Sequence, residues 1–565
     1  MSHKKILIVG GVAGGASAAT RIRRLDEKAE ITIYERGSHV SYSNCSLPFY
    51  LSGIVEESED LLVMTPERFK SQYNITVKVR HEVRKINPDT KTIEINDLDK
   101  DQVLEESYDY LILSPGANPI MPNIPGIDKP NVFSVRNVPD VVNIKNYIEE
   151  NKAKDIVVVG GGFIGIEVAE NLGLAGYKVT IVEAQNQILN NFDYDAVQLL
   201  HKELMDNGVS IVLEDGITSI EDKEITLQSG KKVAADLVIM AIGVRPEISL
   251  AKEAGLEIGK TGGIKVSPNN QASDPSIYAV GDAIEVYNRI TNEPTRFAMA
   301  FPAQMQARST ANHIYGHNDK NPGIIGSICL KVFNLNAAAT GISEKVAKEK
   351  GIQYDFSYII ASDKVGLMPD ANPIHLKLLF EVPTGRILGG QAIGKGDVTK
   401  RIDVIATMIT MNGTLEDLKD LELCYSPMFS TAKDPVNTAA TVGLNLLHGS
   451  FKQVPVYKVR ELVENQAVII DVRERNEFAN GHIINAINIP LSELRENLDK
   501  IPKDKPVYLH CRSSQRSYNA LKVLESEGHS DVYNISGSFL GISLYEYFND
   551  KTKDRKPIVT KYNFN

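Results

Sequence analysis

Two cysteines stand in segments whose residue types suit reactions at sulfur. Cys45 lies in the segment SNCSLP (residues 43–48), off any periodic apolar face, so a reactive thiol is favoured over a buried, inert one. Cys511 follows the apolar run VYLH (residues 507–510) and precedes a predicted helix. A thiol at a helix N-terminus, in a loop of inward-pointing backbone N–H groups, has a lowered pKa and a cradle for an anion or an outer sulfur atom.

The length of the loop that begins at Cys511 indicates which kind of ligand it can hold. It reads Cys-x4-Arg up to Arg516, one residue shorter than the Cys-x5-Arg loop of tyrosine phosphatases, and the smaller ring suits sulfur better than phosphate. Arg473 is a further candidate for contacts to an anion, although it could equally form a structural ion pair with Asp471 or Glu477. The residues predicted to hold the substrate sulfur are Arg512, Ser513, Ser514, Gln515 and Arg516.

Ahead of Cys45, residues 4–35 read as strand, glycine turn, alanine-rich helix and strand. The turn GGVAGG (residues 10–15) lets backbone N–H groups approach a pyrophosphate at the helix N-terminus, and Glu35 at the end of the second strand suits a ribose diol. The strict fingerprint is broken at Val12, where its second glycine would stand. Taken alone, this copy leaves a simple tight strand-to-helix turn as an alternative.

A second copy of the pattern removes most of that doubt. Residues 156–167 end a strand and open a helix with glycines at all three fingerprint positions, and Glu183 ends the following strand. An acidic residue there bonds the ribose 2′-hydroxyl and repels a 2′-phosphate, so NADH is favoured over NADPH. Glu167 in the same helix could be an ordinary buried acid. Two such folds in one chain predict two dinucleotides.

A third signal resembles the two-dinucleotide flavoproteins and indicates which copy holds the flavin. The Gly281-Asp282 element resembles the one whose Asp bonds the FAD ribityl chain, and residues 110–117 and 237–246 resemble the paired crossovers between FAD and NAD domains. The residues implied for FAD are Gly10, Gly11, Val12, Ala13, Gly14, Glu35, Arg36, Ser114, Pro115, Gly116, Gly281 and Asp282, and those implied for NADH are Gly160, Gly162, Ile164, Gly165, Glu183 and Gly243.

The surroundings of Cys45 resemble a particular branch of that family. Glutathione-reductase-like relatives carry Cys-x4-Cys here, but the second position is Tyr50, so an internal disulfide is excluded. A lone thiol beside a flavin can form a sulfenic acid, a mixed disulfide or a persulfide, and the flavin should stabilise its thiolate. Residues 41–48 resemble the active-site loop of coenzyme A-disulfide reductases and the related CoA-persulfide or polysulfide reductases.

That resemblance also implies contacts to the CoA moiety. Arg21 and Arg24 are three residues apart, so one helix face can offer two cations to the phosphates of CoA; the alternative is a pair of solvated arginines on an amphipathic helix. The residues implied for the substrate are Ser17, Arg21, Arg24, Ser41, Asn44, Gln304 and Lys433.

The remainder of the chain resembles two further domains. Residues 323–447 resemble the family's dimerisation domain, which implies a homodimer in which Tyr425 reaches toward the partner's flavin and cysteine and protonates or orients a leaving thiolate; the alternative is a core tyrosine. Residues 455–565 resemble a rhodanese domain, with IIDVRE (469–474) and AINIP (486–490) among its signatures. We therefore expect an α/β chain with FAD-binding (1–117 plus 245–322) and NAD-binding (118–244) Rossmann-like domains, an α+β dimerisation domain and an α/β rhodanese domain.

Composition limits the partners and the compartment. The 565 residues carry a net charge of −10, which argues against nucleic acid or an anionic membrane as a main partner. No apolar run reaches the ~18 residues of a membrane span, and the N-terminus leads straight into a strand, so we expect a cytoplasmic protein. Its four widely spaced cysteines lack zinc spacing, which predicts free thiols and no metal site.

The sequence favours one function over two rivals. We expect NADH to reduce FAD, electrons to reach sulfur on Cys45, and CoA or another small thiol or hydrosulfide to leave. Cys511 would pass sulfane sulfur through a carrier thiol such as CoA toward Cys45. Because a sulfur-transferring domain adds nothing to plain disulfide reduction, persulfide or polysulfide is favoured over CoA disulfide. The rivals are an NADH peroxidase or oxidase that uses a Cys45 sulfenic acid, and a redox or sulfur sensor.

Overall fold

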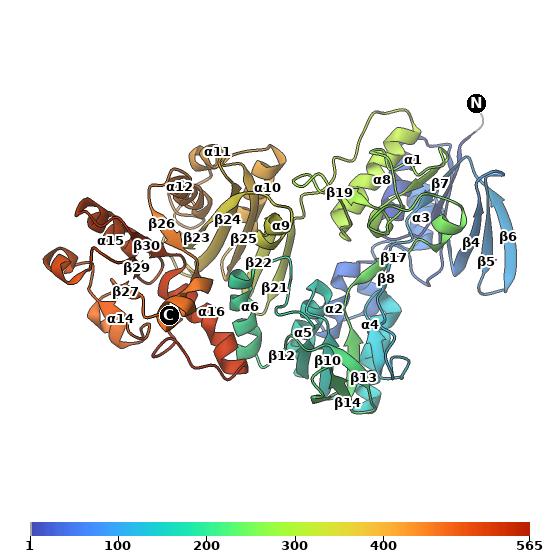
Figure 1. Cartoon of the computed structure of the whole chain (residues 1–565). Coiled ribbons are helices and arrows are strands. Elements are labelled where there is room, and N and C mark those ends of the chain that lie inside the picture. The colour runs from blue at the N-terminus through green and yellow to red at the C-terminus, as the bar shows by residue number, and fades with distance from the viewer. Residues whose placement is uncertain (1–2, 565) are drawn as a thin grey trace. The chain divides into compact units, whose positions relative to one another are not determined.

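The computed structural model describes residues 3–564 and divides into two compact units (Figure 1). The first comprises Met1–Gln185 with Val212–Ile324, and the second Asn186–Ile211 with Ile325–Asn565. Across the described residues, no helix combines the length and apolar character that crossing a bilayer requires. This division splits the segment predicted to bind NAD, because residues 186–211 lie in the second unit.

The first unit begins with a five-stranded sheet in the order β18-β7-β1-β2-β3, with parallel pairs throughout. Its apolar strands are buried on both faces, as parallel strands covered by crossovers require. One face is covered by α1 and α8, whose small residues Ala18 and Ala307 are fully buried. The elements are β1 (Lys5–Val9), α1 (Ala13–Leu25), β2 (Glu30–Glu35), α3 (Pro66–Tyr73), β3 (Thr76–Val79), β7 (Tyr110–Leu113), β18 (Ile277–Ala279) and α8 (Ala300–Ile314).

A second sheet, in the order β12-β11-β10-β16-β9, repeats the same arrangement. Two short antiparallel strands, β8 and β17, carry the chain into and out of this part, as the paired crossovers predicted. The antiparallel sheet β4-β5-β6 and the sheet β13-β14-β15 complete the unit. The main elements are β8 (Ala117–Pro119), β9 (Val132–Ser134), α4 (Val138–Asn151), β10 (Asp155–Val159), α5 (Phe163–Leu174), β11 (Lys178–Val182), β12 (Ser210–Val212), β16 (Leu237–Met240), β17 (Val244–Pro246), β4 (His81–Asn87), β5 (Thr92–Asp97), β6 (Gln102–Ser107), β13 (Ile217–Ile220), β14 (Glu224–Leu227) and β15 (Lys232–Ala234).

The second unit contains an antiparallel sheet in the order β21-β22-β25-β24-β23. Strand β25 is buried along its whole length, because the sheet packs against helices. This part confirms the predicted α+β domain. Its elements are β21 (Ile328–Val332), β22 (Leu335–Gly341), α9 (Glu344–Glu349), β23 (Tyr354–Ser362), β24 (Pro373–Glu381), β25 (Ile387–Gly394), α10 (Thr399–Thr410), α11 (Leu415–Asp420) and α12 (Pro435–Leu447).

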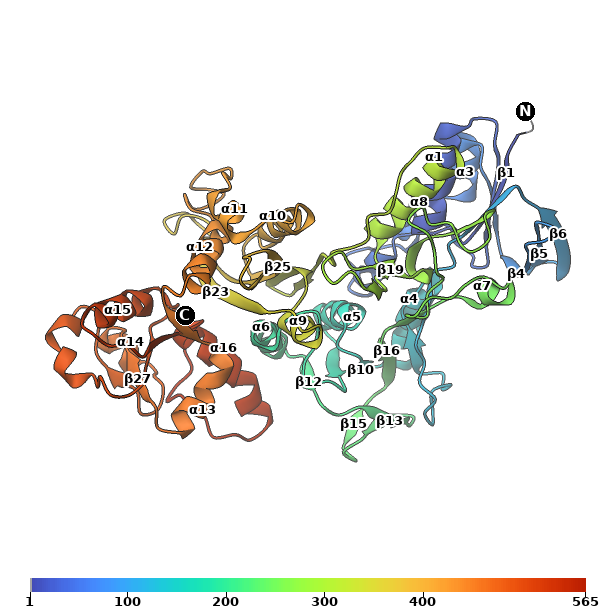
Figure 2. The ribbon, with the colours of Figure 1, turned by 45° about the horizontal axis from the view of Figure 1, so that its top comes forward.

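The C-terminal part of this unit is a parallel sheet in the order β26-β30-β29-β27-β28. Figure 2 labels its strand β27 and the helices α13 to α16 of the same part of the chain. Neighbouring residues of β27 point to opposite faces: Ile470 packs in the cluster with α15, and Ile469 in the cluster with α16. Helices therefore cover both faces, as expected for an α/β domain. The elements are β26 (Lys452–Val454), α13 (Val459–Glu464), β27 (Val468–Asp471), α14 (Arg475–Ala479), β28 (Ile487–Asn488), β29 (Val507–His510), α15 (Gln515–Ser526), β30 (Val532–Ile535) and α16 (Ser538–Thr552).

Helix α6 (Tyr194–Asp206) joins the second unit through contacts with α16. The His201 and Phe548 rings lie 4.5 Å apart between centroids, and Asn549 Nδ2 donates a 2.7 Å hydrogen bond to the Tyr194 hydroxyl. Burial lowers the pKa of His201 to about 3, so this imidazole is neutral in the packed helix pair. A helix from the middle of the sequence thus shares a core with the last helix of the chain.

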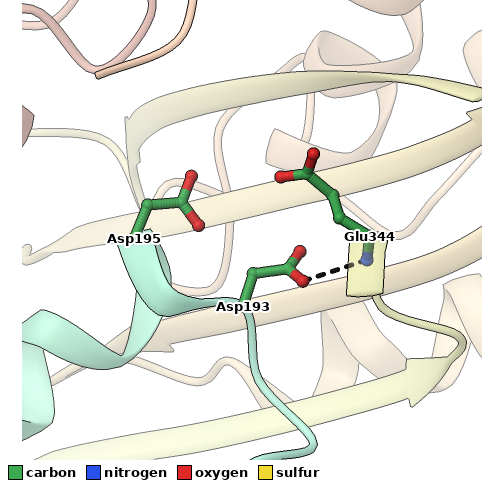
Figure 3. Close-up of side chains that lie close together, drawn as sticks. All are labelled: Asp193, Asp195 and Glu344. Atoms are coloured by element: carbon green, nitrogen blue, oxygen red, sulfur yellow. Dashed lines mark hydrogen bonds between the residues drawn. The ribbon is translucent and has the colours of Figure 1, made fainter. Parts of the chain in front are cut away.

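Three buried carboxylates gather at the start of α6 and α9 (Figure 3). Asp193 accepts a 3.0 Å hydrogen bond from the Glu344 backbone N–H, drawn as the dashed line in Figure 3. The ammonium of Lys377, on β24, lies 2.8 Å from Asp195 Oδ1, 2.5 Å from Glu344 Oε1 and 3.2 Å from Asp193 Oδ2. The group is therefore an internal ion cluster whose cation is a lysine.

Candidate active site

Cys45 lies in a 3₁₀ turn, Asn44–Ser46, that leads directly into α2 (Leu47–Leu51). Pro48 in the first turn of α2 favours helix initiation, and Leu47, Pro48 and Leu51 are buried, whereas the Cys45 thiol is exposed. Ser41 adopts a left-handed backbone with φ of 50°, and its N–H donates a 2.9 Å hydrogen bond to the Gly11 carbonyl. This hydrogen bond attaches the loop that carries Cys45, residues 41–48 and called the cysteine loop below, to the first glycine turn.

The protein groups around Cys45 do not favour its thiolate. Although the residue keeps exposed surface, part of its side chain is shielded from water, which raises the thiol pKa, and the carboxylates of Glu167 and Asp282 raise it further. Glu167 is itself half-buried, and burial together with Glu170 raises its pKa to about 7. These protein groups therefore work against ionisation of the Cys45 thiol.

Position 50, where relatives with an internal disulfide carry a second cysteine, is occupied in a different way. The Lys145 ammonium of α4 lies 4.5 Å from the centroid of the Tyr50 ring, a cation–π contact. Beside it, the Ser52 hydroxyl donates a 2.6 Å hydrogen bond to Asn171 of α5. Tyr50 thus helps to anchor α2 to the second dinucleotide fold.

A cavity of about 500 Å³ opens at the carboxyl ends of β1 and β2. Gly10 has a φ of +90°, and an added Cβ there would meet the Ser114 carbonyl at 2.1 Å, so the turn requires glycine. Glu35 accepts hydrogen bonds from the N–H groups of Gly11, at 3.0 Å, and Gly37, at 2.8 Å. Of the residues predicted for FAD, all but Gly11 line the cavity: Gly10, Val12, Ala13, Gly14, Glu35, Arg36, Ser114, Pro115, Gly116, Gly281 and Asp282.

Other lining residues were not expected from the sequence. Tyr42, His81, Arg84, Arg136 and Asn137 also line the cavity, from the cysteine loop, strand β4 and the start of α4. No sequence motif predicts these residues, because they come from separate segments that only the folded chain brings together at the cavity. The glycine turn, the acidic strand end and the basic side chains together fit a dinucleotide such as FAD.

The second glycine turn repeats this geometry. Glu183 accepts from the N–H groups of Gly161, at 2.7 Å, and Gln185, at 2.8 Å, matching the two bonds of Glu35. Gly162 caps α5 and has no neighbouring atom within 4 Å of an added Cβ, so space is open above the helix N-terminus. Positive φ values at Gly160 and Gly243, and an exposed Ile164, suit close approach of a ligand; an added Cβ at Gly165 would meet the Gly160 carbonyl at 2.0 Å.

The predicted CoA-contacting residues of the first unit lie on α1, α8 and the cysteine loop. Arg21 donates two hydrogen bonds, of 2.9 and 2.7 Å, to Asn312 of α8. Arg24 lies over the ring of Tyr73 at 5.7 Å. The structure groups Ser17, Arg21 and Arg24 on one helix, leaves Gln304 exposed on α8, and places Asn44 in the cavity wall.

Tyr425 and Lys433 lie in the second unit, between α11 and α12. Tyr425 is 51% exposed and stands beside the exposed Met428 and Phe429, so it is not a core residue in the single chain. Lys433 is also exposed and directly precedes Asp434, which caps α12. Neither lines the cavity of the first unit.

Cys511 stands at the end of β29, immediately before the turn into α15. Its side chain is buried, with the Ser517 and Ser538 hydroxyl oxygens 3.5 and 3.9 Å from its sulfur. Ser514 adopts a left-handed backbone with φ of 77°, which bends the loop into α15. Among residues 3–564, no acceptor is found for the loop N–H groups of Arg512, Ser513 and Ser514, which leaves these donors without a partner in the chain. Ser538 was missed because it is 27 residues away.

The arginines near Cys511 have separate partners. Arg473 is buried and forms an ion pair of 2.6 Å with Asp471, which settles its open assignment in favour of a structural pair. Arg516 instead donates two hydrogen bonds to Glu477, of 2.7 and 2.8 Å. Arg512 is half-buried, whereas Gln515 is exposed. The pKa of Arg516 is raised by Glu477 and, to a smaller degree, by the Cys511 side chain, so this guanidinium lies close to the thiol as well as to the carboxylate.

Comparison with known proteins agrees with this architecture. The family model for pyridine nucleotide-disulphide oxidoreductases matches residues 4–307, that family's dimerisation domain matches residues 329–435, and the rhodanese-like domain matches residues 456–544. A coenzyme A disulfide reductase of Staphylococcus epidermidis is 35% identical over 434 residues, covering 77% of this chain and 98% of that protein.

Two solved structures resemble nearly the whole chain. Reduced CoADR-RHD of Bacillus anthracis has 44% identity and a TM-score of 0.94, covering 98% of this chain and 99% of that one. An NAD-dependent persulfide reductase from A. fulgidus has 36% identity and a TM-score of 0.90, covering 95% and 99%. With its two dinucleotide folds, dimerisation domain and C-terminal rhodanese-like domain, the chain belongs to the pyridine nucleotide-disulphide oxidoreductase family.

Proposed function

We propose that this protein uses NADH and FAD to reduce CoA persulfide or polysulfide, and CoA disulfide, through the single thiol of Cys45. One observation carries the proposal: an exposed cysteine, without a partner cysteine, is fastened by Ser41 to the glycine turn of a dinucleotide cavity. The same chain holds a second sulfur site at Cys511, which gives persulfide chemistry a use that plain disulfide reduction does not require.

The proposed reaction at Cys45 balances with CoA persulfide, NADH and one proton as its only reactants. Bound FAD would accept a hydride from NADH and supply the electron pair that cleaves a sulfur–sulfur bond. The Cys45 thiolate attacks the CoA-bound sulfur of CoA–S–SH, which forms Cys45–S–S–CoA and releases hydrosulfide. Two electrons then return Cys45 and CoA to their thiolates. In sum, CoA–S–SH, NADH and one proton give CoA–SH, hydrogen sulfide and NAD⁺.

The remaining predicted residues have assigned roles in this proposal. Ser17, Arg21, Arg24, Ser41, Asn44 and Gln304 contact CoA, with Lys433. The dimerisation domain indicates a homodimer, in which Tyr425 would act at the partner's site as donor or orienting group for the leaving thiolate. We expect the protein and its small-molecule thiol substrates to meet in the reducing cytoplasm, where the four cysteines do not form disulfides.

The proposal is tested by separating the two sulfur sites. In Cys511→Ser, sulfur transfer from a persulfide to cyanide should fall at least about 100-fold because the nucleophile is lost, while NADH-dependent reduction of CoA disulfide stays within about twofold. Thiocyanate formation and NADH oxidation measure the two reactions. Cys424→Ser, another cysteine of the second unit, is the matched control and should change neither.

The same assays would also identify either of the two rival functions. If the wild-type protein consumes NADH with peroxide or oxygen and not with CoA persulfide or CoA disulfide, the proposal is wrong and the peroxidase or oxidase takes its place. If steady-state turnover is negligible with every acceptor, the sensor takes its place.

Preference for NADH over NADPH gives a second prediction. Because Glu183 places a carboxylate at the second glycine turn, Glu183→Ser should raise kcat/KM for NADPH by about tenfold by removing repulsion of the 2′-phosphate. Steady-state kinetics with both nucleotides measure the ratio. Glu221→Ser, an exposed acid of the same part of the chain, should leave it unchanged. An unaltered NADPH value in Glu183→Ser would contradict the assignment.

A further inference from the structure

Ser538 has a backbone conformation that a residue with a side chain rarely adopts. It is the first residue of α16, its φ is 49°, and it directly follows Gly537, whose φ is 73°. This left-handed region is open to glycine, whereas a Cβ makes it unfavourable. Such strain persists in folded proteins mainly where the side chain has a use. The position of the Ser538 hydroxyl indicates what that use is.

The Ser538 hydroxyl lies at the reacting atom of the second sulfur site. The side chain is fully buried, and its Oγ accepts a 3.1 Å hydrogen bond from the Cys511 backbone N–H and lies 3.9 Å from the Cys511 sulfur. Two backbone hydrogen bonds fix this arrangement: the Phe539 N–H donates to the Cys511 carbonyl at 3.0 Å, and the Leu540 N–H to the Arg512 carbonyl at 3.2 Å. The start of α16 is therefore bonded directly to the Cys511 loop.

The hydroxyl proton of Ser538 has two acceptors within reach. One is the Ile535 carbonyl, 3.3 Å away, which already accepts a 3.0 Å hydrogen bond from the Ser514 hydroxyl; the other is the Cys511 sulfur. A hydrogen bond to an ionised acceptor is stronger than one to a neutral acceptor. We therefore expect the proton to turn to the sulfur whenever that atom is a thiolate, beside the Ser517 hydroxyl at 3.5 Å.

We infer that Ser538 is a further catalytic residue of the second sulfur site, whose hydroxyl stabilises the Cys511 sulfur as it leaves as a thiolate. This inference rests on the proposed sulfur transfer at Cys511. In loading, Cys511–S⁻ attacks the outer sulfur of R–S–S⁻, which gives Cys511–S–S⁻ and R–S⁻. In discharge, an acceptor R′–S⁻ attacks that outer sulfur, which gives R′–S–S⁻ and Cys511–S⁻. Each step forms one sulfur–sulfur bond and breaks another, so no oxidant or reductant is consumed.

The two steps differ in how the charge on the Cys511 sulfur changes. In the loaded protein the negative charge is on the outer sulfur, and the sulfur bonded to the Cys511 Cβ is neutral. During discharge the charge returns to that inner sulfur, where a hydroxyl donor stabilises it in the transition state. During loading the charge leaves the inner sulfur, so the same donor gives no such help. Loss of the hydroxyl should therefore slow discharge more than loading.

The test measures both steps in the full-length holoenzyme with Ser538→Gly and Ser538→Ala. In both variants, release of thiocyanate from loaded protein with cyanide should fall about tenfold, while loading by glutathione persulfide changes less than about threefold. Mass spectrometry should show more persulfide on Cys511 during turnover. The glycine variant should unfold at a higher temperature than the alanine variant, because only glycine relieves the left-handed backbone. Equal kinetic defects at unequal stabilities would identify the hydroxyl as their cause.

A second buried serine of α16 provides the matched control. Within residues 3–564 the Ser543 hydroxyl has no hydrogen-bond partner, so Ser543→Ala should leave loading and discharge unchanged. The inference is wrong if both Ser538 variants discharge as fast as the wild type, or if loading slows as much as discharge, which would indicate a displaced loop. Wild-type protein that takes up no sulfur on Cys511 would instead disprove the proposed transfer itself.

Discussion

Cys45→Ser is expected to lower NADH-dependent reduction of CoA persulfide and CoA disulfide by at least about a thousandfold. A serine hydroxyl has a far higher pKa than a thiol and cannot form the mixed disulfide, so the covalent step has no substitute in the chain. The protein should still bind FAD, because Cys45 does not line the dinucleotide cavity. Sulfide release and NADH oxidation, followed in steady state, measure the loss.

Two measurements distinguish this result from a folding defect. Bleaching of the flavin absorbance by NADH should persist in Cys45→Ser, since hydride transfer to FAD does not use the thiol. Cys329→Ser, an exposed cysteine on β21, should retain full turnover. If Cys45→Ser kept wild-type turnover with sulfur substrates, the mechanism would have to be abandoned.

Lys377→Met should destabilise the second unit by about 3–5 kcal/mol, because it leaves three buried carboxylates without their cation. Burial alone would lower the pKa of Lys377, but Asp195, Asp193 and Glu344 outweigh it and raise that pKa well above its ordinary value. The ammonium is therefore charged throughout the physiological range. Thermal unfolding should show a midpoint lower by about 10 °C for this unit.

The defect should depend on pH in a definite direction. Without the ammonium, burial and mutual repulsion raise the carboxylate pKa values in the folded state, so the folded state binds more protons than the unfolded one. The loss of stability is then smallest below about pH 4, the ordinary carboxyl pKa, and grows as pH rises from there through the raised pKa values of the folded state.

A neighbouring lysine offers the matched control. Lys348 lies 3.8 Å from Glu344 but is largely exposed, so Lys348→Met should cost less than about 1 kcal/mol. Equal midpoints for the Lys348 and Lys377 variants would show that the buried cluster does not support the fold.

The two dinucleotide folds could be predicted in detail because their signals are local. Gly160, Gly165 and Glu183 meet within one strand–turn–helix–strand unit, and the backbone geometry that demands glycine also fixes the acid's position. The same holds for Gly10 and Glu35, even though Val12 breaks the fingerprint. Cys45 could be singled out for a related reason, because its loop follows the first strand–turn–helix–strand segment, residues 4–35, directly.

Features that depend on distant residues could not be read in this way. Arg473 had two acids within reach in sequence, Asp471 and Glu477, and only the fold shows that it pairs with Asp471 while Arg516 takes Glu477. The ion cluster joins Asp193 to Lys377, 184 positions later, with no periodic pattern to connect them. Tertiary packing decides such pairs, and local spacing does not record it.

Because α6 and α16 share a core, the C-terminal domain is not an independent module that can be removed without effect on the rest of the second unit. Truncation after residue 450 would strip His201 of its aromatic neighbour Phe548 and leave the Tyr194 hydroxyl facing water. The staphylococcal relative, whose 434 aligned residues make up 98% of its length, has no room for such a tail. A version of this protein shortened at this point would therefore leave the face of α6 that packs against α16 exposed to solvent.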